Sequence, residues 1–262
     1  MSEGPVIAEV LEGGKLLWLT IAAGKGNVLS SPVLQALTAE LESHKGDKHL
    51  RAVVIQGSGG HFSFGASVEE HRKDHAAAML TTFHASLRAV AAFPVPVVAL
   101  VEGKCLGGAF ELALVCHVVL ATANANFACP EIKLGVLPPV LVALGPSRLG
   151  GAWTEKLVLT GCDLPLSAAE STGFATILPA SDDAKATALQ WLHKNLLGLS
   201  AHSLRVTTKL VRHCAGADQE TGLGPILDLA ERTYVRELIP SHDGNEGIEA
   251  FLARRAPQWQ DQ

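Results

Sequence analysis

The stretch Val95-Pro96-Val97-Val98-Ala99-Leu100-Val101, with Gly107-Gly108-Ala109-Phe110-Glu111-Leu112-Ala113-Leu114 soon after it, decides the fold class. The β-branched run predicts a buried strand over 95–101. The Gly-Gly step predicts a tight turn that opens a helix over 108–116, and the next apolar run predicts a strand over 117–121. Strands that alternate with helices across short connections indicate an α/β architecture.

The chain before this stretch continues the pattern. Apolar runs over 6–9 and 16–21 predict an opening β-hairpin, and a β-branched run predicts a third strand over 52–55. Apolar residues at helical spacing predict one helix from Ser31 onward and another over 79–92. After about residue 182 the sequence predicts an almost wholly helical region.

The composition excludes several classes of partner. The chain has 262 residues, of which 48% are hydrophobic and 18% charged, and a formal net charge of −5. This acidic balance argues against nucleic acid or an anionic membrane as the main partner. Five cysteines without a CxxC pair indicate buried thiols in a reducing compartment. No signal peptide or membrane-spanning run is visible, so we expect a cytoplasmic protein.

Two glutamates set in apolar runs are the strongest candidates for chemistry. Glu111 follows the Gly-Gly turn, and Glu131 lies in Phe127-Ala128-Cys129-Pro130-Glu131-Ile132. Burial raises the pKa of a carboxyl group toward neutrality, where general acid/base catalysis operates. The alternative is structural, because a glutamate in a first helical turn is stabilised by the macrodipole and one after proline is often solvated.

Other candidate sites find little support. His71 and His75 have the spacing of metal ligands on one helix face, but no third ligand is in view, so we expect no metal. We interpret them as the solvated surface of a polar helix beginning near Val68. No Gly-Lys pair is followed by Ser or Thr as in a P-loop, and no serine lies in a GxSxG motif.

Three separated motifs together resemble the crotonase family of enoyl-CoA hydratases and isomerases. They are His61-Phe62-Ser63-Phe64-Gly65-Ala66-Ser67, Gly103 to Glu111, and Pro130-Glu131-Ile132-Lys133-Leu134-Gly135. The resemblance implies a spiral of ββα units over residues 1–181 and a C-terminal helical region over 182–262. It also implies that this region packs the chain into homotrimers or dimers of trimers.

The resemblance assigns roles to four positions. The backbone N–H groups of Ala66 and Gly108 would form an oxyanion hole for a CoA thioester carbonyl, where negative charge develops as water attacks the β-carbon. Glu111 would activate and orient the water, and Glu131 would exchange the proton with a substrate carbon. CoA would be part of the substrate, so no separate cofactor is expected.

Further substrate or CoA contacts are expected around these positions. Phe64, Gly65 and Gly107 flank the oxyanion donors, and Lys25 and Gly26 fall where the family places part of its CoA-binding loop. In the C-terminal region, the apolar faces around 189–197 and 226–229 exceed what an appendage needs to cover itself. We therefore expect these faces to carry oligomerisation.

Two departures from the usual family pattern bear on the substrate. Ser67 stands where an aspartate is usual, and Leu137-Pro138-Pro139-Val140-Leu141-Val142 replaces a glycine-rich stretch. Pro138 is expected to remove a donor and stiffen the backbone, and Val140 to narrow and dry the pocket. Both departures resemble hydratases that act on cyclohexa-1,5-diene-1-carbonyl-CoA, the cyclic diene formed from benzoyl-CoA in anaerobic aromatic degradation.

Two alternatives remain open. One is another enzyme of the same fold, such as a linear enoyl-CoA hydratase or isomerase of fatty-acid oxidation or a decarboxylase. The other is a non-catalytic CoA- or RNA-binding paralogue, against which the acidic balance and the presence of both Glu111 and Glu131 count.

Overall fold

The main β-sheet confirms the α/β architecture. In the computed structural model, which describes residues 4–214 and 223–260, six strands pair in the order β1-β2-β3-β4-β6-β9. The first two strands are antiparallel, as the hairpin pattern predicts, and the other pairs are parallel. The strands are β1 (Val6–Leu11), β2 (Leu16–Ile21), β3 (Ala52–Gly57), β4 (Val97–Val101), β6 (Val118–Ala121) and β9 (Thr176–Ile177). Strands β3 and β4 are almost entirely buried, as expected for parallel strands covered on both faces.

A second, smaller sheet brings the two glutamate-bearing segments together. Among the described residues it pairs β5 (Lys104–Leu106) with β7 (Asn126–Ala128), and β7 with β8 (Asp163–Leu164). Strand β5 runs directly into the Gly-Gly turn, and β7 runs directly into the segment of Glu131. Because β5 and β7 are parallel neighbours, these two exits lie side by side.

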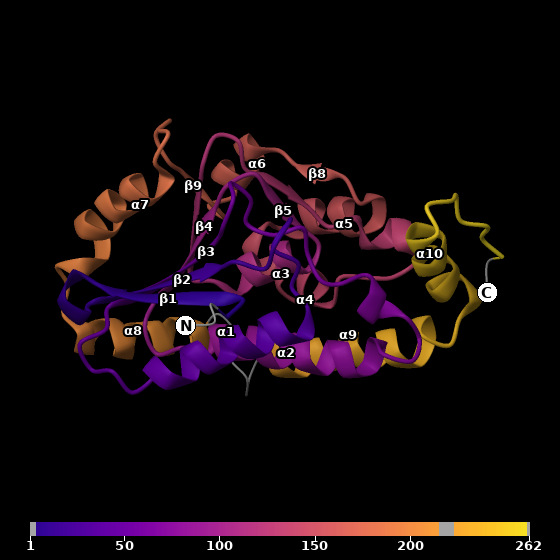
Figure 1. Cartoon of the computed structure of the whole chain (residues 1–262), viewed down its shortest axis with the longest axis horizontal. Helices are drawn as coiled ribbons and strands as arrows, with labels where there is room; N and C mark the ends of the chain where they lie inside the picture. The colour runs from indigo at the N-terminus through magenta and orange to yellow at the C-terminus, as the bar shows by residue number, and fades with distance from the viewer. Residues whose placement is uncertain (1–3, 215–222, 261–262) are drawn as a thin grey trace.

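Helices cover both faces of the main sheet (Figure 1). On one face, α1 packs against α2, and the completely buried α3 packs against α2 and α4. The apolar side chains of these helices form one large core with alternate residues of the strands. The helices in this part are α1 (Ser31–His44), α2 (Ala76–Ala91), α3 (Gly108–Val115), α4 (Pro139–Arg148), α5 (Gly151–Thr160) and α6 (Leu166–Ser171), with the short helices η1 (Glu12–Gly14), η2 (Glu69–His71) and η3 (Pro130–Leu134).

Within residues 183–214 and 223–260, the C-terminal region is largely helical, as predicted. Its elements are α7 (Ala184–Leu192), η4 (His193–Leu197), α8 (Ala201–Cys214), α9 (Leu223–Thr233), η5 (Tyr234–Leu238) and α10 (His242–Leu252). Figure 1 shows α10 at the end of the molecule away from α7. A boundary between two domains at residue 182 stays a prediction.

The apolar face around 189–197, expected to carry oligomerisation, packs against the main sheet of the same chain. Leu192 and Leu197 are buried against Trp18 and Val98 on the second face of the main sheet, and Leu189 and Leu196 pack against the same core. The apolar face around 189–197 therefore covers the protein's own sheet. On α9, by contrast, Ile226 and Leu229 are 48% and 59% exposed.

The prediction of a polar helix from about Val68 onward is wrong. Only the short helix η2 forms there, and the backbone of Arg72 leaves it with φ −57° and ψ 145°, which is not helical. The long helix α2 then begins at Ala76. His71, at the end of η2, is half-buried, whereas His75 is exposed, so only His75 lies on a solvated surface.

The cysteine side chains that the structure describes are mostly buried. Cys105, Cys116 and Cys129 are buried free thiols, and Cys162 is partly buried, whereas the side chain of Cys214 lies outside what the structure describes. None of the helices in the described part of the chain combines the length and apolar character needed to cross a membrane.

Candidate active site

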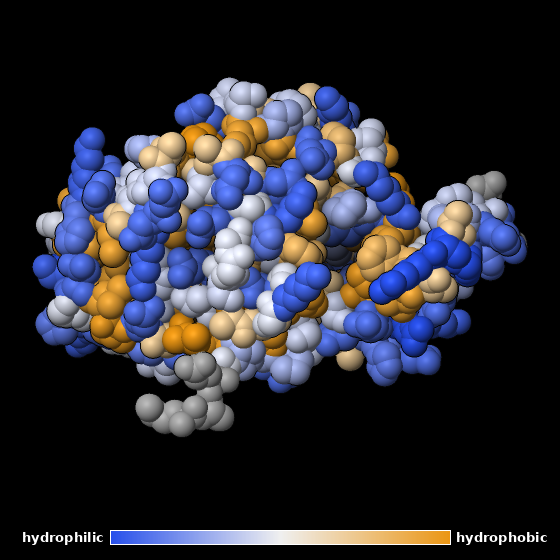
Figure 2. Space-filling model, turned by 45° about the horizontal axis from the view of Figure 1, so that its top comes forward, coloured by the Kyte–Doolittle hydropathy of each residue, from blue (hydrophilic) through white to orange (hydrophobic). Residues whose placement is uncertain are grey.

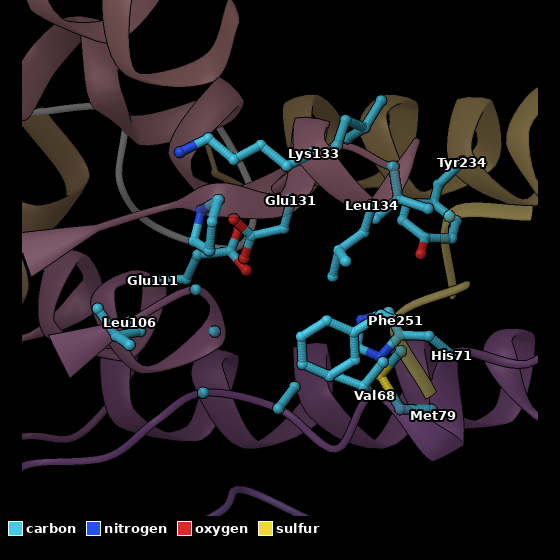
Figure 3. A pocket seen from close by; sticks show the side chains of 18 of the residues that line it. Val68, His71, Met79, Leu106, Glu111, Glu131, Lys133, Leu134, Tyr234 and Phe251 are labelled. Atoms are coloured by element: carbon cyan, nitrogen blue, oxygen red, sulfur yellow. The ribbon is translucent and has the colours of Figure 1, made fainter. Parts of the chain in front are cut away.

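A cavity of about 510 Å³ lies where the small sheet, α2 and the C-terminal helices meet. Figure 2 shows a hollow in the molecular surface, on the side of the molecule that carries α10. Most of the side chains that line the cavity are apolar, among them Met79, Leu80, Phe83, Leu134 and Leu137. The carboxyl groups of Glu111 and Glu131 face one another at one end (Figure 3).

The Gly107-Gly108 turn makes room for Glu131. Gly107 has φ 53° and ψ −126°, a conformation that side-chain-bearing residues rarely adopt. A Cβ atom at this position would lie 2.6 Å from Oε1 of Glu131. The Gly107 N–H donates to the Ala128 carbonyl oxygen at 2.7 Å, which ties the turn to the end of β7. Glycine is therefore required here both by the backbone and by the neighbouring carboxyl group.

The two predicted oxyanion donors, Ala66 and Gly108, lie against one another. A Cβ atom on Gly108 would lie 3.3 Å from the Cβ of Ala66, and one on Gly65 would lie 3.5 Å from the Gly108 nitrogen. Gly65 has φ 103°, and a Cβ atom on it would lie 2.6 Å from the Leu106 carbonyl oxygen. Within the described residues, neither the Ala66 N–H nor the Gly108 N–H donates to a protein acceptor. Two free N–H groups, one of them at the start of α3, thus border the cavity.

Glu111 is held by the start of α4. Its Oε1 accepts hydrogen bonds from the backbone N–H groups of Val140 at 2.6 Å and Leu141 at 3.2 Å, and the residue is only 3% exposed. Burial raises the pKa of Glu111 above its ordinary value, while these two hydrogen bonds oppose the shift by stabilising the carboxylate. Glu111 is therefore the carboxyl group of the pair that loses its proton more readily.

Glu131 has the higher pKa of the two glutamates. Its Oε2 is buried and has no hydrogen-bond partner among the described residues. Burial and the nearby charge of Glu111 raise its pKa, against the smaller opposing effects of its own N–H and the Cys129 thiol. Glu131 therefore keeps its proton to higher pH than Glu111, and two carboxyl groups with different pKa values on one cavity suit acid/base catalysis.

Pro138 and Val140 do not line the cavity, which corrects their expected role as contact residues. Pro138 precedes α4, and the side chain of Val140 lies in the core. Val140 acts through its N–H group, which holds Glu111. The neighbouring Leu137 and Pro139 form the apolar wall in their place.

Of the two residues predicted to lie in a CoA-binding loop, Gly26 contacts a residue of the cavity wall and Lys25 does not border the cavity. A Cβ on Gly26 would lie 2.6 Å from the ring of Phe64, whose N–H donates to the Gly26 carbonyl oxygen at 2.7 Å. Phe64 borders the cavity, so Gly26 supports its wall. Lys25 is exposed and is not among the described residues that border the cavity.

The sequence motifs do not predict the residues at the end of the cavity away from Glu111 and Glu131. The sequence pattern places His71 on a solvated surface and gives no site role to Tyr234, Phe251 or Arg255, although all four border the cavity. Phe251 and Arg255 lie on or just after α10, and their sequence carries no catalytic motif. Tyr234 had one available signal, since it is the only tyrosine in the chain.

A metal centre finds no support. Among residues 4–214 and 223–260, no group of three or more His, Cys, Asp or Glu side chains is arranged to hold a metal ion.

Comparison with known proteins shows similarity along nearly the whole chain. The family model described as "Enoyl-CoA hydratase/isomerase" matches residues 15–262. Cyclohexa-1,5-dienecarbonyl-CoA hydratase of Thauera aromatica is 36% identical over 248 residues, which cover 95% of this chain and 94% of that protein. 2,3-Dehydroadipyl-CoA hydratase of Escherichia coli (strain K12) is 33% identical, with 89% and 90% covered. The crystal structure of an enoyl-CoA hydratase from Mycobacterium avium subsp. paratuberculosis K-10 matches with a TM-score of 0.83 at 27% identity, covering 98% of this chain and 99% of that one.

Proposed function

Because the chain belongs to the enoyl-CoA hydratase/isomerase family, as its motifs predicted, we propose that it adds water to an α,β-unsaturated acyl-CoA thioester. One observation carries the proposal: two buried carboxyl groups of unequal basicity face a single apolar cavity beside two free N–H groups. The acyl-CoA is the substrate itself, and the reaction needs no further cofactor.

In the proposed reaction, the thioester oxygen accepts hydrogen bonds from the Ala66 and Gly108 N–H groups. The Glu111 carboxylate takes a proton from water as the water oxygen bonds to the β-carbon, and the electrons of the double bond move to the thioester oxygen. The two N–H donors stabilise that charge. Protonated Glu131 then gives its proton to carbon, so the substrate gains one water molecule. A proton passes from Glu111 to Glu131 to restore the starting state.

We propose cyclohexa-1,5-diene-1-carbonyl-CoA as the substrate and a 6-hydroxycyclohex-1-ene-1-carbonyl-CoA as the product. Support comes from the similarity to the Thauera aromatica enzyme over almost the full length of both proteins. The stiff apolar wall of Leu137 and Pro139 beside Glu111 also suits a compact ring. Attack at the β-carbon of this diene gives a delocalised anion that can be protonated at its far end.

A linear enoyl-CoA is the second candidate, favoured by the 33% identity with 2,3-dehydroadipyl-CoA hydratase. We propose that either reaction takes place in the cytoplasm, in a homotrimer or a dimer of trimers.

Purified protein incubated with the cyclic diene and with crotonyl-CoA, in both reaction directions, tests the proposal. We expect a specificity constant at least about tenfold higher for the cyclic diene, since a misfitting acyl group loses roughly 1–3 kcal/mol of transition-state binding. An equal or higher value for crotonyl-CoA would favour the linear substrate. If the protein hydrates neither compound, the proposed hydratase activity is refuted.

A further inference from the structure

The end of the cavity away from the two glutamates carries a buried hydroxyl group without a partner. Tyr234 is 2% exposed, and its hydroxyl oxygen finds no hydrogen-bond partner in the described part of the protein. Figure 3 shows this hydroxyl pointing into the cavity, on the other side of Leu134 from Glu131. Leaving a buried hydroxyl unpaired costs about 1–3 kcal/mol, so such a group is expected to meet a ligand or water.

The chemistry of Tyr234 makes it a hydrogen-bond donor. Burial, together with the charges of Glu131 and Glu111, raises the pKa of its hydroxyl, which therefore keeps its proton. Tyr234 begins the π-helical turn η5 directly after α9, and such turns are frequent at functional sites. A phenylalanine would fill the same apolar space without the unpaired hydroxyl.

His71 adds a hydrogen-bond acceptor to the same end of the cavity (Figure 3). Its Nδ1 lies 2.7 Å from the carbonyl oxygen of Ser67, and a carbonyl oxygen only accepts, so Nδ1 carries the proton. Burial lowers the pKa of His71 despite the hydrogen bond to Ser67 and the charge of Glu70, so the ring is neutral. Its Nε2 therefore has a lone pair to offer.

We propose that Tyr234 and His71 form a subsite for a hydroxyl group that the acyl moiety carries on a carbon remote from the thioester. The inference rests on the proposed function, since it requires an acyl-CoA in the cavity. A hydroxyl group matches both residues, because it accepts from the Tyr234 O–H and donates to His71 Nε2. An unsubstituted acyl group leaves these positions to a water molecule.

A carboxylate is a poorer match for this subsite. It has no proton to give to His71 Nε2, and it would share the cavity with the charge of Glu111. Arg255, a cation that borders the cavity, is already held by both carboxylate oxygens of Glu246. The subsite thus selects a neutral oxygen substituent.

Calorimetric binding of benzoyl-CoA, 3-hydroxybenzoyl-CoA and 4-hydroxybenzoyl-CoA tests the subsite without turnover. These rigid rings differ only in the presence and position of a hydroxyl group. We expect one hydroxylated ligand to bind wild-type protein at least about tenfold more tightly than benzoyl-CoA, as expected when a paired polar group replaces an unpaired one.

Two matched variants assign the preference to the named residues. Tyr234→Phe retains the ring, so we expect it to abolish the preference while benzoyl-CoA binding stays within about twofold. His71→Asn keeps a side-chain N–H for the Ser67 carbonyl and removes the Nε2 acceptor, so the preference should fall there too. Leu159→Ala, on the exposed surface of α5 and away from the cavity lining, should leave the ratio unchanged.

The outcomes separate this inference from the proposed function. If wild-type protein binds all three ligands equally, or if the preference survives Tyr234→Phe, the subsite is refuted while the acyl-CoA site stands. If the protein binds none of the three, both the subsite and the ring-acyl substrate are refuted, and enoyl-CoA turnover then decides the hydratase reaction separately.

Discussion

The two glutamates, Glu111 and Glu131, have different surroundings. Backbone N–H groups at the start of α4 hold the Glu111 carboxylate, whereas Oε2 of Glu131 meets no donor in the described chain. Both groups are buried, and each disfavours the charge of the other. We therefore propose that the same residue type supplies a base at one position and an acid at the other.

This arrangement makes stability depend on pH. Burial raises the pKa of Glu111 to about 7 and, together with the charge of Glu111, that of Glu131 to about 8. A carboxyl group with a raised folded-state pKa contributes stability that is fully present below its ordinary pKa and is lost as the pH rises through the raised value. The unfolding free energy of the wild-type protein should therefore fall between about pH 5 and pH 9. In Glu131→Gln we expect this fall to be smaller by roughly 1–3 kcal/mol.

Denaturant unfolding at both pH values measures this difference. Glu155→Gln, on the exposed surface of α5, serves as the control and should lose as much stability as wild type. A Glu131→Gln variant with the wild-type pH slope would show that the carboxyl group is not destabilised in the folded protein.

Ala66 should contribute through its backbone. Because the proposed donor is the N–H group, Ala66→Ser is expected to retain most activity, while Ala66→Pro removes the donor and should lower turnover by at least about a hundredfold. Circular dichroism and acyl-CoA binding establish that the proline variant is folded. A folded, active proline variant would place the oxyanion donors elsewhere.

Among the secondary-structure elements, the small sheet matters most for the site. The parallel pairing of β5 and β7 sets the Gly107-Gly108 turn against the segment of Glu131. Helix α3 then carries Glu111 to the start of α4, so helix ends supply N–H groups both to a carboxylate and to the cavity. The reacting groups thus sit on element ends fixed by hydrogen bonds.

We expect Gly107→Ala to lower turnover by at least about a hundredfold, because the added Cβ displaces the Glu131 carboxyl group and the backbone becomes strained. Gly173→Ala is the matched control. Gly173 also has a positive φ, of 73°, but nothing lies within 4 Å of the position of its Cβ. It should lose about 1 kcal/mol of stability and keep its activity. Equal activity of both variants would contradict the role of Gly107.

The sequence predicted those parts of the site whose signals are local. The β-branched run before the Gly-Gly turn, the turn itself and the apolar setting of each glutamate all lie within short segments. His71 and Tyr234 could not be placed in this way, since η2 and η5 meet the same cavity only through tertiary packing. Pro138 and Val140 were misplaced because periodicity does not show which residue of a first helical turn faces a cavity.

For the whole molecule, the C-terminal helices complete the cavity and leave an apolar surface uncovered. Phe251 borders the cavity, and Arg72 of the η2 segment pairs with Glu249 of α10 at 3.0 Å. On α8 and α9, five apolar side chains are about half exposed or more: Val206, Leu210, Val211, Ile226 and Leu229. Such a surface is expected to be covered in an assembly.

We therefore expect light scattering to give a mass about three or six times the 27.5 kDa of one chain. Leu229→Glu should shift the protein toward smaller species, since it places a charge in the proposed interface. A wild-type protein that stays at the mass of one chain would contradict assembly through this surface.

Turnover of Glu111→Gln and Glu131→Gln variants tests the central claim most directly, because the account rests on two carboxyl groups that act on one acyl-CoA. With cyclohexa-1,5-diene-1-carbonyl-CoA as substrate, we predict that each variant loses at least about a hundredfold in kcat, while the Kd for a saturated acyl-CoA changes by no more than about threefold. Near-wild-type hydration by either variant would contradict the account, because that carboxyl group would then take no part in the reaction.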